Sequence, residues 1–329
     1  MMGYYLAPME GVTGYIYRNA YHSVFEPADK YFTPFIATNQ NQKLRTRDLK
    51  DVLPEHNQGL TIVPQILSNC AADFLLLAKR LQQLGYQEIN LNLGCPSGTV
   101  VAKKKGSGFL AFPAELDRFL EAVCADLPEG MGLSVKTRIG KEDPDEMVRL
   151  LKIYNQYPLT ELIVHPRIQT DYYKNKPNLE VFEEILVKSR IPVCYNGDIR
   201  SVDDCSRFEE RFPQTENIML GRGVIADPSL IGRLKARAEG GGNTGGPVLR
   251  ERLMVFHDCL YRGYQEEMSG DRNVLFKMKE VWSYLIASVP DAAKDWKRIR
   301  KAVTAAAYEE AIALLFEKKE WTAGLEKES

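Results

Sequence analysis

The stretch Glu88–Pro96 reads EINLNLGCP, a short strand candidate that runs into a loop carrying a thiol. Comparable apolar runs recur as far as about Arg237, alternate with amphipathic segments, and are often continuous. Continuous apolar runs are typical of parallel strands that helices cover. The sequence predicts eight such strands, at Tyr4–Ala7, Tyr31–Phe35, Thr61–Ile66, Glu88–Leu93, Gly132–Thr137, Glu161–His165, Ile191–Tyr195 and Asn217–Leu220.

Helix signals lie between these strands. They are an amphipathic run at Ala72–Leu84 followed by Gly85, a start at Pro113, a capping box at Ser201 and Asp204, and a cap followed by proline at Asp227-Pro228. Eight strands, each followed by a helix or loop, predict a closed (β/α)8 barrel. A doubly wound sheet is the alternative, but it usually has a glycine-rich first turn, whereas the first strand here ends in APMEG.

The composition changes after the barrel pattern ends. Residues 241–246 read GGNTGG, which is typical of a flexible linker. Beyond it, helical spacing recurs at Leu249–Glu267, Val274–Ala287, Ala292–Ala307 and Tyr308–Glu317. We therefore expect a catalytic barrel over residues 1–240, a linker at 241–246 and a smaller all-helical domain over 247–329.

Bulk properties narrow the class of protein. The 329 residues are 44% hydrophobic and carry a net charge of -1, which counts mildly against a dedicated nucleic-acid binder but allows a local basic patch. No run approaches the ~20 apolar residues that a membrane helix needs, and the N-terminus predicts no signal peptide. Six cysteines without metal-ligand or scaffold spacing predict a reducing, cytoplasmic location and no metal site.

In such barrels function lies at the carboxyl ends of the strands. Polar loops are common, which explains one or two polar strand ends but explains a complete ring poorly. The ring predicted here consists of Pro8, Met9, Glu10, Gln65, Asn92, Cys95, Lys136, Arg138, His165, Arg167, Asn196, Gly197, Asp198, Gly221, Arg222 and Gly223.

Three members of the ring suggest chemistry. A thiol of ordinary pKa (~8.5) is protonated at neutral pH, so Cys95 can donate a proton, unless it is a buried structural cysteine. Lys136 can stabilise negative charge on a reduced flavin, although an exposed lysine and a Schiff-base lysine remain alternatives. His165 can hydrogen-bond a phosphate, a flavin or a base edge.

Two glycine turns follow the seventh and eighth strands, Asn196-Gly197-Asp198 and Gly221-Arg222-Gly223. These loops are the usual phosphate site of a (β/α)8 barrel, where backbone N–H groups receive the anion and Arg222 adds a forked donor. Together they suggest FMN, because a dinucleotide usually comes with a different fingerprint.

Over roughly the first 230 residues, this sequence resembles the tRNA-dihydrouridine synthases. The blocks that carry the resemblance are Ala7–Thr13 (APMEGVT), Pro64–Ile66 (PQI), Leu91–Ser97 (LNLGCPS), Val135–Arg138 (VKTR), Val164–Arg167 (VHPR), Asn196–Ile199 (NGDI) and Leu220–Gly223 (LGRG). Two departures are Glu10, where many relatives have a small residue, and Ile168, where a threonine is usual.

The resemblance implies an NAD(P)H-dependent oxidoreductase acting on a CH–CH bond, with NADPH as reductant of the flavin. Flavin N5 would deliver hydride to C6 of a flipped-out uridine in the D-loop of tRNA, and Cys95 would protonate C5. The helical domain would contact tRNA. The implied FMN contacts are Pro8, Met9, Glu10, Gln65, Lys136, His165, Asn196, Gly197, Asp198, Gly221 and Arg222, and the implied substrate contacts are Asn92, Arg138 and Arg167.

Other functions remain open at this point. An FMN barrel that acts on a free pyrimidine such as dihydroorotate would share the phosphate loops and the lysine. A flavin-free aldolase would use Lys136 as a Schiff base, and a tRNA-binding protein without catalysis would need neither Lys136 nor Cys95. A tRNA-sized substrate is compatible with a monomer.

Overall fold

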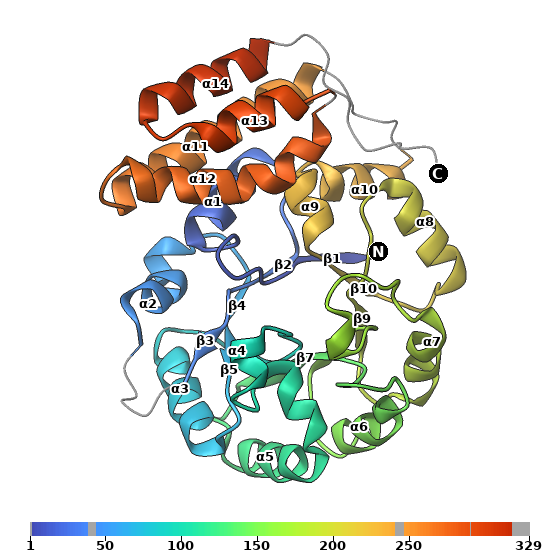
Figure 1. Cartoon of the computed structure of the whole chain (residues 1–329). Helices are drawn as coiled ribbons and strands as arrows, with labels where there is room; N and C mark the ends of the chain where they lie inside the picture. The colour runs from blue at the N-terminus through green and yellow to red at the C-terminus, as the bar shows by residue number, and fades with distance from the viewer. Residues whose placement is uncertain (1, 39–43, 241–246, 290, 318–329) are drawn as a thin grey trace.

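The computed structural model describes residues 2–38, 44–240, 247–289 and 291–317, and it contains the predicted barrel (Figure 1). One sheet holds ten strands in the order β3-β5-β6-β7-β8-β9-β10-β1-β2-β4, with parallel pairing throughout. The strands are β1 (Gly3–Leu6), β2 (Lys30–Phe32), β3 (Ile36–Ala37), β4 (Ile62–Val63), β5 (Gln65–Leu67), β6 (Glu88–Leu93), β7 (Gly132–Arg138), β8 (Glu161–His165), β9 (Val193–Tyr195) and β10 (Asn217–Leu220).

Ten strands make eight barrel positions, because two positions are each divided into a pair of short strands. β2 and β3 form one position, and β4 and β5 form the next. β2 pairs with β4 and β3 pairs with β5, both in parallel. Pro64 interrupts the β4–β5 position because proline has no N–H to donate to the ladder. At the same level the Gln65 N–H bonds to the Thr33 hydroxyl at 3.0 Å. The eight predicted strands are therefore confirmed, with two interruptions that the pattern did not predict.

Helices surround the barrel (Figure 1). They are α1 (Tyr15–Val24), α2 (Thr46–Val52), α3 (Ala71–Gln83), α4 (Gly98–Val101), α5 (Pro113–Asp126), α6 (Glu146–Tyr154), α7 (Leu179–Lys188), α8 (Val202–Arg211), α9 (Arg222–Ala226) and α10 (Leu230–Ala238), with 3₁₀ turns at Pro54–His56, Gly106–Ala111 and Gln169–Asp171.

Most predicted helix signals are confirmed. Proline opens α5, and Ser201 and Asp204 form a reciprocal capping box on α8. The cap predicted at Asp227-Pro228 was wrong by two residues, since α10 begins only at Leu230 with Ser229 as its N-cap. The Asp227 carboxylate instead accepts hydrogen bonds from the N–H and hydroxyl of Ser229, and it pairs with Arg233. A side chain that caps its own turn in this way competes with helix initiation.

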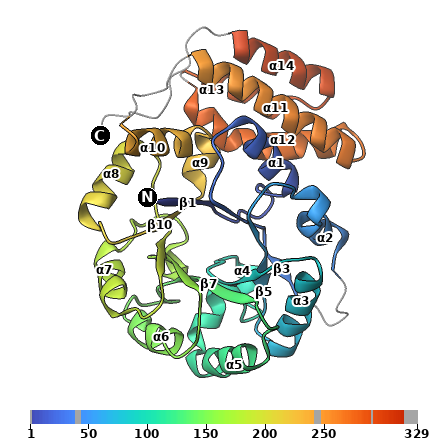
Figure 2. The ribbon, with the colours of Figure 1, turned by 180° about the vertical axis from the view of Figure 1, so that it is seen from behind.

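Four further helices gather on one side of the barrel, beside α1 and α9 (Figures 1 and 2). They are α11 (Pro247–Glu267), α12 (Asp271–Leu285), α13 (Ala293–Lys301) and α14 (Ala305–Glu317), and a 3₁₀ turn spans Ile286–Ser288. The predicted linker at 241–246 lies outside the described residues. Within the described ranges, no helix combines the length and apolarity that crossing a membrane requires.

The helix predicted at Ala292–Ala307 was wrong, because the chain leaves helical geometry between α13 and α14. Thr304 accepts a hydrogen bond from the Ala307 N–H through its hydroxyl at 3.3 Å, so it caps α14. The break also frees the Ala302 carbonyl, which accepts from Lys279 on α12. Helical spacing across residues 292–307 did not reveal this tertiary contact.

The barrel interior is packed below its mouth. Tyr5, Phe32, Ile163 and Met219 belong to a buried apolar cluster that is separate from the core between sheet and helices. At the level of the strand starts, Glu161 accepts a hydrogen bond from the Tyr5 hydroxyl at 3.2 Å. The filled interior leaves the carboxyl ends of the strands as the place for a ligand.

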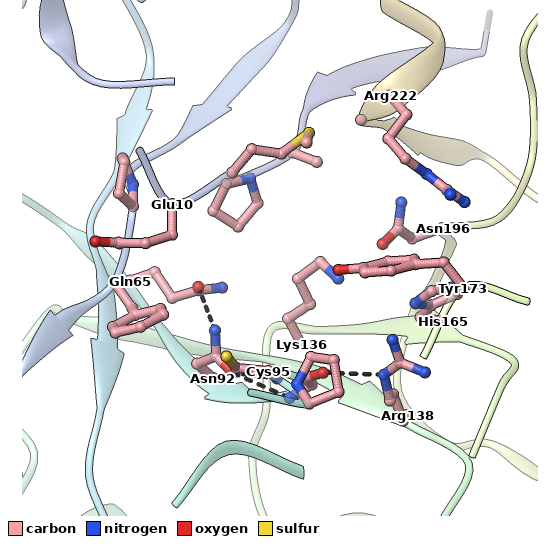
Figure 3. A pocket seen from close by; sticks show the side chains of 18 of the residues that line it. Glu10, Gln65, Asn92, Cys95, Lys136, Arg138, His165, Tyr173, Asn196 and Arg222 are labelled. Carbon is pink, nitrogen blue, oxygen red and sulfur yellow. Dashed lines mark hydrogen bonds between the residues drawn. The ribbon is translucent and has the colours of Figure 1, made fainter. Parts of the chain in front are cut away.

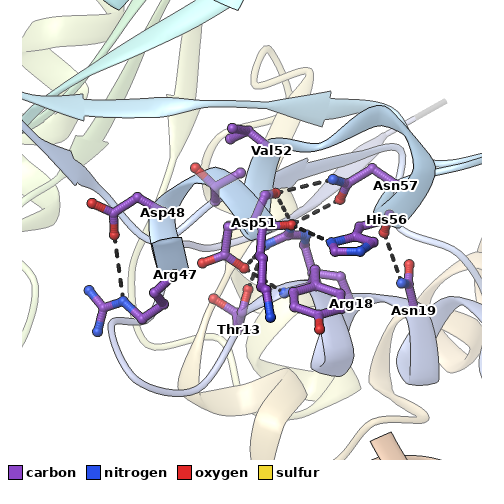
Figure 4. A network of polar contacts seen from close by, with 12 residues as sticks. Thr13, Arg18, Asn19, Arg47, Asp48, Asp51, Val52, His56 and Asn57 are labelled. Atoms are coloured by element: carbon purple, nitrogen blue, oxygen red, sulfur yellow. Dashed lines mark hydrogen bonds and ion pairs between the residues drawn. The ribbon is translucent and has the colours of Figure 1, made fainter. Parts of the chain in front are cut away.

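A buried arginine fixes the loop that leads from β1 to α1 (Figure 4). Arg18 donates to the Thr13 carbonyl at 2.9 Å, the Asp51 carbonyl at 2.7 Å and the Asn57 side chain at 2.8 Å. The Thr13 hydroxyl in turn accepts from the Met9 N–H at 2.8 Å. Through these contacts α1 and α2 hold the segment that carries Pro8, Met9 and Glu10.

Candidate functional site

A cavity of about 480 Å³ opens at the carboxyl ends of the strands (Figure 3). This volume lies within the usual range of ligand sites. It is lined by Ala7, Pro8, Met9, Glu10, Pro34, Phe35, Gln65, Asn92, Gly94, Cys95, Pro96, Lys136, Arg138, His165, Tyr173, Asn196, Gly197, Asp198, Gly221, Arg222 and Tyr284. Every residue of the predicted ring except Arg167 and Gly223 therefore lines one cavity.

An amide network positions the Cys95 loop (Figure 3). The Asn92 side-chain oxygen accepts from the N–H groups of Gly94 and Cys95 at 3.0 and 2.9 Å, and its nitrogen donates to Gln65 at 2.6 Å. Gln65 in turn donates to Asn90 at 2.7 Å. Asn92 thus holds the thiol loop, and one hydrogen of its amide nitrogen remains for a ligand.

A second segment packs behind the same loop. The Cys95 carbonyl accepts from the N–H and hydroxyl of Ser107, at 3.1 and 2.8 Å. Gly106 adopts a φ of 56°, and a Cβ there would lie 2.8 Å from the Cys95 carbonyl oxygen. This close approach requires glycine at position 106.

The environment keeps the Cys95 thiol protonated. Burial raises its pKa above the ordinary value, and the charge of Glu10 adds to the effect. The Ser97 backbone N–H, Arg138 and Lys136 oppose this shift without cancelling it. A thiol that holds its proton at neutral pH suits a proton donor better than a nucleophile.

Lys136 brings an unpaired cation into the cavity. Among the residues that the structure describes, no acceptor or carboxylate is paired with its ammonium group. Burial, followed by the charge of Arg138, lowers the pKa of Lys136 to about 8. A desolvated cation without a partner favours a ligand with negative charge or a polarised carbonyl at this point.

Arg167 lies behind the cavity wall rather than in the cavity, where it was expected to meet the substrate. Its side chain is buried and pairs with Asp198, and its Nη1 donates to His165 Nε2 at 2.8 Å. Because arginine only donates, Nε2 must accept, and the proton of a neutral His165 ring is then on Nδ1. Burial and the charge of Arg138 lower the pKa of His165 far below its usual value, so the ring is neutral.

Asp198 links the two glycine turns. It accepts from Arg167 on one side and from Arg222 at 2.7 Å on the other. Burial raises the pKa of Asp198, but the hydrogen bond from Arg167 and the charges of Arg167 and Arg222 outweigh burial, so the net shift is downward. Gly223 permits close packing of the second turn, because a Cβ there would lie 2.3 Å from the Ile199 carbonyl oxygen.

Tyr173 spans the arginine side of the cavity (Figure 3). Its ring centre lies 4.6 Å from the Arg222 guanidinium and 5.4 Å from that of Arg138. Arg138 itself donates to the carbonyls of Gly94, Ile168 and Tyr172 at 3.0, 2.8 and 2.7 Å. Most N–H groups of Arg138 therefore bond to loop carbonyls, whereas the resemblance implied a contact with the substrate.

Sequence reasoning missed the three aromatic side chains that line the cavity: Phe35, Tyr173 and Tyr284. Phe35 lies in the interruption between β2 and β3, and Tyr173 in the loop after β8. Tyr284 comes from α12, so the helical region completes the wall of the barrel site. The paired Tyr172-Tyr173 was the only available signal, and nothing in the sequence pointed to Tyr284.

The fold and the site together place this protein among the (β/α)8-barrel enzymes that bind a ligand at the carboxyl ends of the strands. Its mouth carries a protonated thiol, an unpaired lysine and two glycine turns. The described residues contain no group of three or more histidine, cysteine, aspartate or glutamate side chains that could hold a metal ion. The family described as dihydrouridine synthase matches residues 5–319, and the chain belongs to that family.

Individual relatives agree with the family assignment. A tRNA-dihydrouridine(16) synthase of Pseudomonas putida is 28% identical over 309 residues, covering 90% of this chain and 92% of the relative. The corresponding protein of Haemophilus influenzae is 31% identical over 243 residues, covering 71% and 77%. A probable tRNA-dihydrouridine synthase 1 of Synechocystis is 25% identical and covers 87% and 79%.

Among solved structures, a morphinone reductase mutant in complex with tetrahydroNAD is similar in fold. Its TM-score is 0.50 at 13% sequence identity, and the match covers 72% of this chain and 87% of that one. At this identity the likeness supports the barrel architecture alone.

Proposed function

We propose that this protein reduces uridine to 5,6-dihydrouridine in the D-loop of tRNA, with FMN as cofactor and Cys95 as proton donor. The observation that carries the proposal is that the protonated Cys95 thiol and the unpaired Lys136 cation line one cavity. Membership of the dihydrouridine synthase family supplies the reaction. The relatives named tRNA-dihydrouridine(16) synthase suggest uridine 16 as the target.

The residues present fit FMN. The cavity has a suitable volume, and Lys136 offers an unpaired cation to the electron-rich edge of a flavin. Gly221 lines the opposite end, where a Cβ would approach the Ala7 Cβ to 3.4 Å and the Met9 sulfur to 3.6 Å. With Arg222 beside it, this end suits a phosphate group. Pro8, Met9, Glu10, Gln65, His165, Asn196, Gly197 and Asp198 complete the proposed contacts.

Held beside Lys136 and the two glycine turns, FMN that NADPH has reduced would supply the hydride that C6 of the uracil accepts. The new C6–H bond shifts the C5=C6 electron pair toward C5 and the C4 carbonyl. Cys95 then transfers its thiol proton to C5, and the thiolate recovers a proton from solvent. Because burial raises the thiol pKa, the proton is present when it is needed.

The remaining side chains hold this geometry. Asn92 positions the Cys95 loop and keeps one amide hydrogen for the base edge. His165 presents Nδ1–H as a donor, and Arg167 fixes that tautomer from behind. We therefore assign Arg167 a positioning role. Arg138 both holds the surrounding loops and lines the cavity, where it faces the Tyr173 ring.

The helical region 247–329 is proposed as the part of the protein that contacts tRNA. It approaches the cavity through Tyr284, so a bound RNA would touch both regions at once. The cytoplasmic location predicted from the unpaired cysteines belongs to the same proposal, because tRNA is the substrate.

The proposal is tested by incubating the purified flavin-loaded protein with unmodified tRNA and NADPH, followed by mass spectrometry of the tRNA. We expect dihydrouridine at position 16, and no product with a transcript in which uridine 16 is replaced by cytidine. Turnover of free uracil or orotate without a change in tRNA would instead establish a small-molecule reductase. Flavin bleaching with NADPH against NADH measures the preference for the reductant.

A further inference from the structure

Phe276 is an exposed aromatic side chain on the helix that borders the cavity. It is 68% exposed, more than either Tyr172 (45%) or Tyr173 (52%), the other large aromatic residues exposed in the described part of the chain. Its neighbours Val274, Leu275 and Met278 are buried against the other helices. Leaving a phenylalanine in water is unfavourable, and such a side chain often marks a binding surface.

The position of α12 relates Phe276 to the cavity. Tyr284, two helical turns later, lines the cavity, and Lys277 donates to the Gly11 carbonyl at 2.6 Å, next to Glu10 on the cavity wall. At 1.5 Å per residue, Phe276 lies about 12 Å from Tyr284 along the helix. A tRNA segment that reaches the cavity along α12 therefore passes Phe276.

The charge around Phe276 favours a polyanion. α12 presents exposed Arg272, and α13 presents five exposed cations: Lys294, Lys297, Arg298, Arg300 and Lys301. The nearby carboxylates are largely engaged within the protein, since Glu280 pairs with Lys277, Asp295 with Arg298, and Asp271 accepts from the Ala305 N–H. The chain as a whole carries a net charge of -1, so these cations are a local concentration.

α12 and α13 are also joined beside Phe276. Lys279, one turn beyond Phe276, donates to the Ala302 carbonyl at the end of α13. The basic end of α13 is thereby held against the helix that carries the aromatic ring. Cations that bind phosphates and an aromatic ring that stacks on bases form the usual pair of features in single-stranded nucleic-acid sites.

We propose that Phe276 stacks on an unpaired base of the tRNA, outside the cavity, while Arg300 and Lys301 bind the adjacent phosphates. The inference rests on the proposed function and adds to it a recognition point separate from the target uridine. Stacking makes Phe276 a determinant of tRNA affinity. The tRNA must present an unpaired base beside α12, on one side of the cavity mouth. The ring takes no part in the reduction.

The test compares the flavin-loaded wild type with Phe276→Ala, Phe276→Leu and Phe276→Trp, measuring Kd for unmodified tRNA by fluorescence anisotropy over a salt series. We expect Phe276→Ala and Phe276→Leu to weaken binding by about five- to hundredfold and Phe276→Trp to retain it. The slope of log K against log salt stays unchanged in all three, since no charge is altered. Arg300→Gln with Lys301→Gln should lower that slope by roughly 1 to 2.

Val187→Ala is the matched control, because Val187 is 78% exposed on α7, away from α11–α14 (Figure 1). Melting curves confirm that each variant is folded, and kcat for dihydrouridine formation should be unchanged in Phe276→Ala while KM rises. Wild-type affinity in Phe276→Ala overturns the inference but leaves the proposed function standing. A change in sedimentation mass with unchanged tRNA affinity would identify Phe276 as a contact between copies and would also overturn it. A wild type that makes no dihydrouridine overturns the proposed function itself.

Discussion

The two sides of the cavity are built from different chemistry. The thiol wall consists of Gln65, Asn92 and Cys95, where uncharged amides fix the loop by hydrogen bonds of 2.6–3.0 Å. The cationic wall consists of Lys136, Arg138, Arg222 and His165, supported by Asp198 and Arg167. No carboxylate in the described part of the chain pairs with Lys136, while Arg222 shares the carboxylate of Asp198 with Arg167.

The difference between the two walls shows how one cavity contains both a proton donor, Cys95, and a site for a negatively charged group beside Lys136. Amides orient the Cys95 thiol without adding a charge that would release its proton, so burial decides its pKa. On the neighbouring cationic wall, burial and then the surrounding positive charges keep His165 neutral, and Lys136 stays available for a ligand. The two walls meet where Arg138 donates to the Gly94 carbonyl, and burial still outweighs the charges of Arg138 and Lys136 at the Cys95 thiol.

Replacing the thiol should give the largest effect. We expect Cys95→Ala to reduce kcat for dihydrouridine formation by about 10²–10⁴-fold, because no other acid lies on the thiol wall. Flavin content, read from absorbance, should stay at the wild-type level. Cys70→Ala, an exposed thiol outside the cavity, is the control and should leave kcat unchanged. Equal rates for the wild type and Cys95→Ala would remove the distinction between the walls.

Lys136→Met breaks the cationic wall. We expect flavin affinity to fall by roughly 100-fold, while the flavin-free protein becomes more stable, because a buried unpaired cation is removed. A pKa of about 8 for a lysine of ordinary value 10.5 corresponds to an order of 3 kcal/mol of unfavourable burial at neutral pH. Thermal melting with and without FMN measures both effects. A lower melting temperature for the flavin-free variant would contradict the assignment.

The pH dependence of flavin binding sharpens the contrast. Lys136 is protonated below its pKa of about 8 and loses its charge as the pH rises through that value. FMN affinity should therefore fall by about tenfold between pH 7 and pH 9. Lys136→Arg should bind with little pH dependence, since arginine keeps its charge. The Cys95 thiol, whose pKa is raised by burial, keeps its proton over most of this window.

Asp198→Asn should produce the smallest change. It removes the shared carboxylate and leaves the buried Arg167 with a weaker acceptor, at a cost of about 2 kcal/mol in the free energy of unfolding. We expect kcat to fall only severalfold, because His165 loses part of its support while the thiol wall is intact. Urea unfolding and steady-state kinetics on the same preparation separate the two effects. A loss of kcat as large as that of Cys95→Ala would show that the walls do not act separately.

Local pattern was sufficient to predict most of the barrel and of the site. Eight apolar runs gave the eight barrel positions, and the residues just after them share one cavity because parallel strands end on the same side. Where tertiary contacts decide, the sequence was insufficient. The interruptions at Thr33 and Pro64, the turn at Asp227 and the break at Ala302–Thr304 each depend on partners distant in the fold or on a competing side-chain hydrogen bond.

The placements within the candidate site that the sequence did not predict have a similar origin. Arg167 follows a strand directly, as a cavity residue does, but its donors are taken by His165, Asp198 and the Asn175 carbonyl. Tyr284 lies more than a hundred residues after β8 and reaches the cavity only because α12 packs on α9. Neither placement follows from periodicity or motif spacing.

The contact between α12 and the loop after β1 has a consequence for the order of biosynthesis. A ribosome produces all eight barrel positions before it produces Lys277 and Tyr284, so the strands of the barrel are complete before the lining side chain that α12 supplies. The loop after β1 is thus secured by a residue that follows it 266 positions later in the sequence. A chain that ended before α12 would retain Cys95 and Lys136 but would lack Tyr284 in the cavity and the Lys277 hydrogen bond to Gly11.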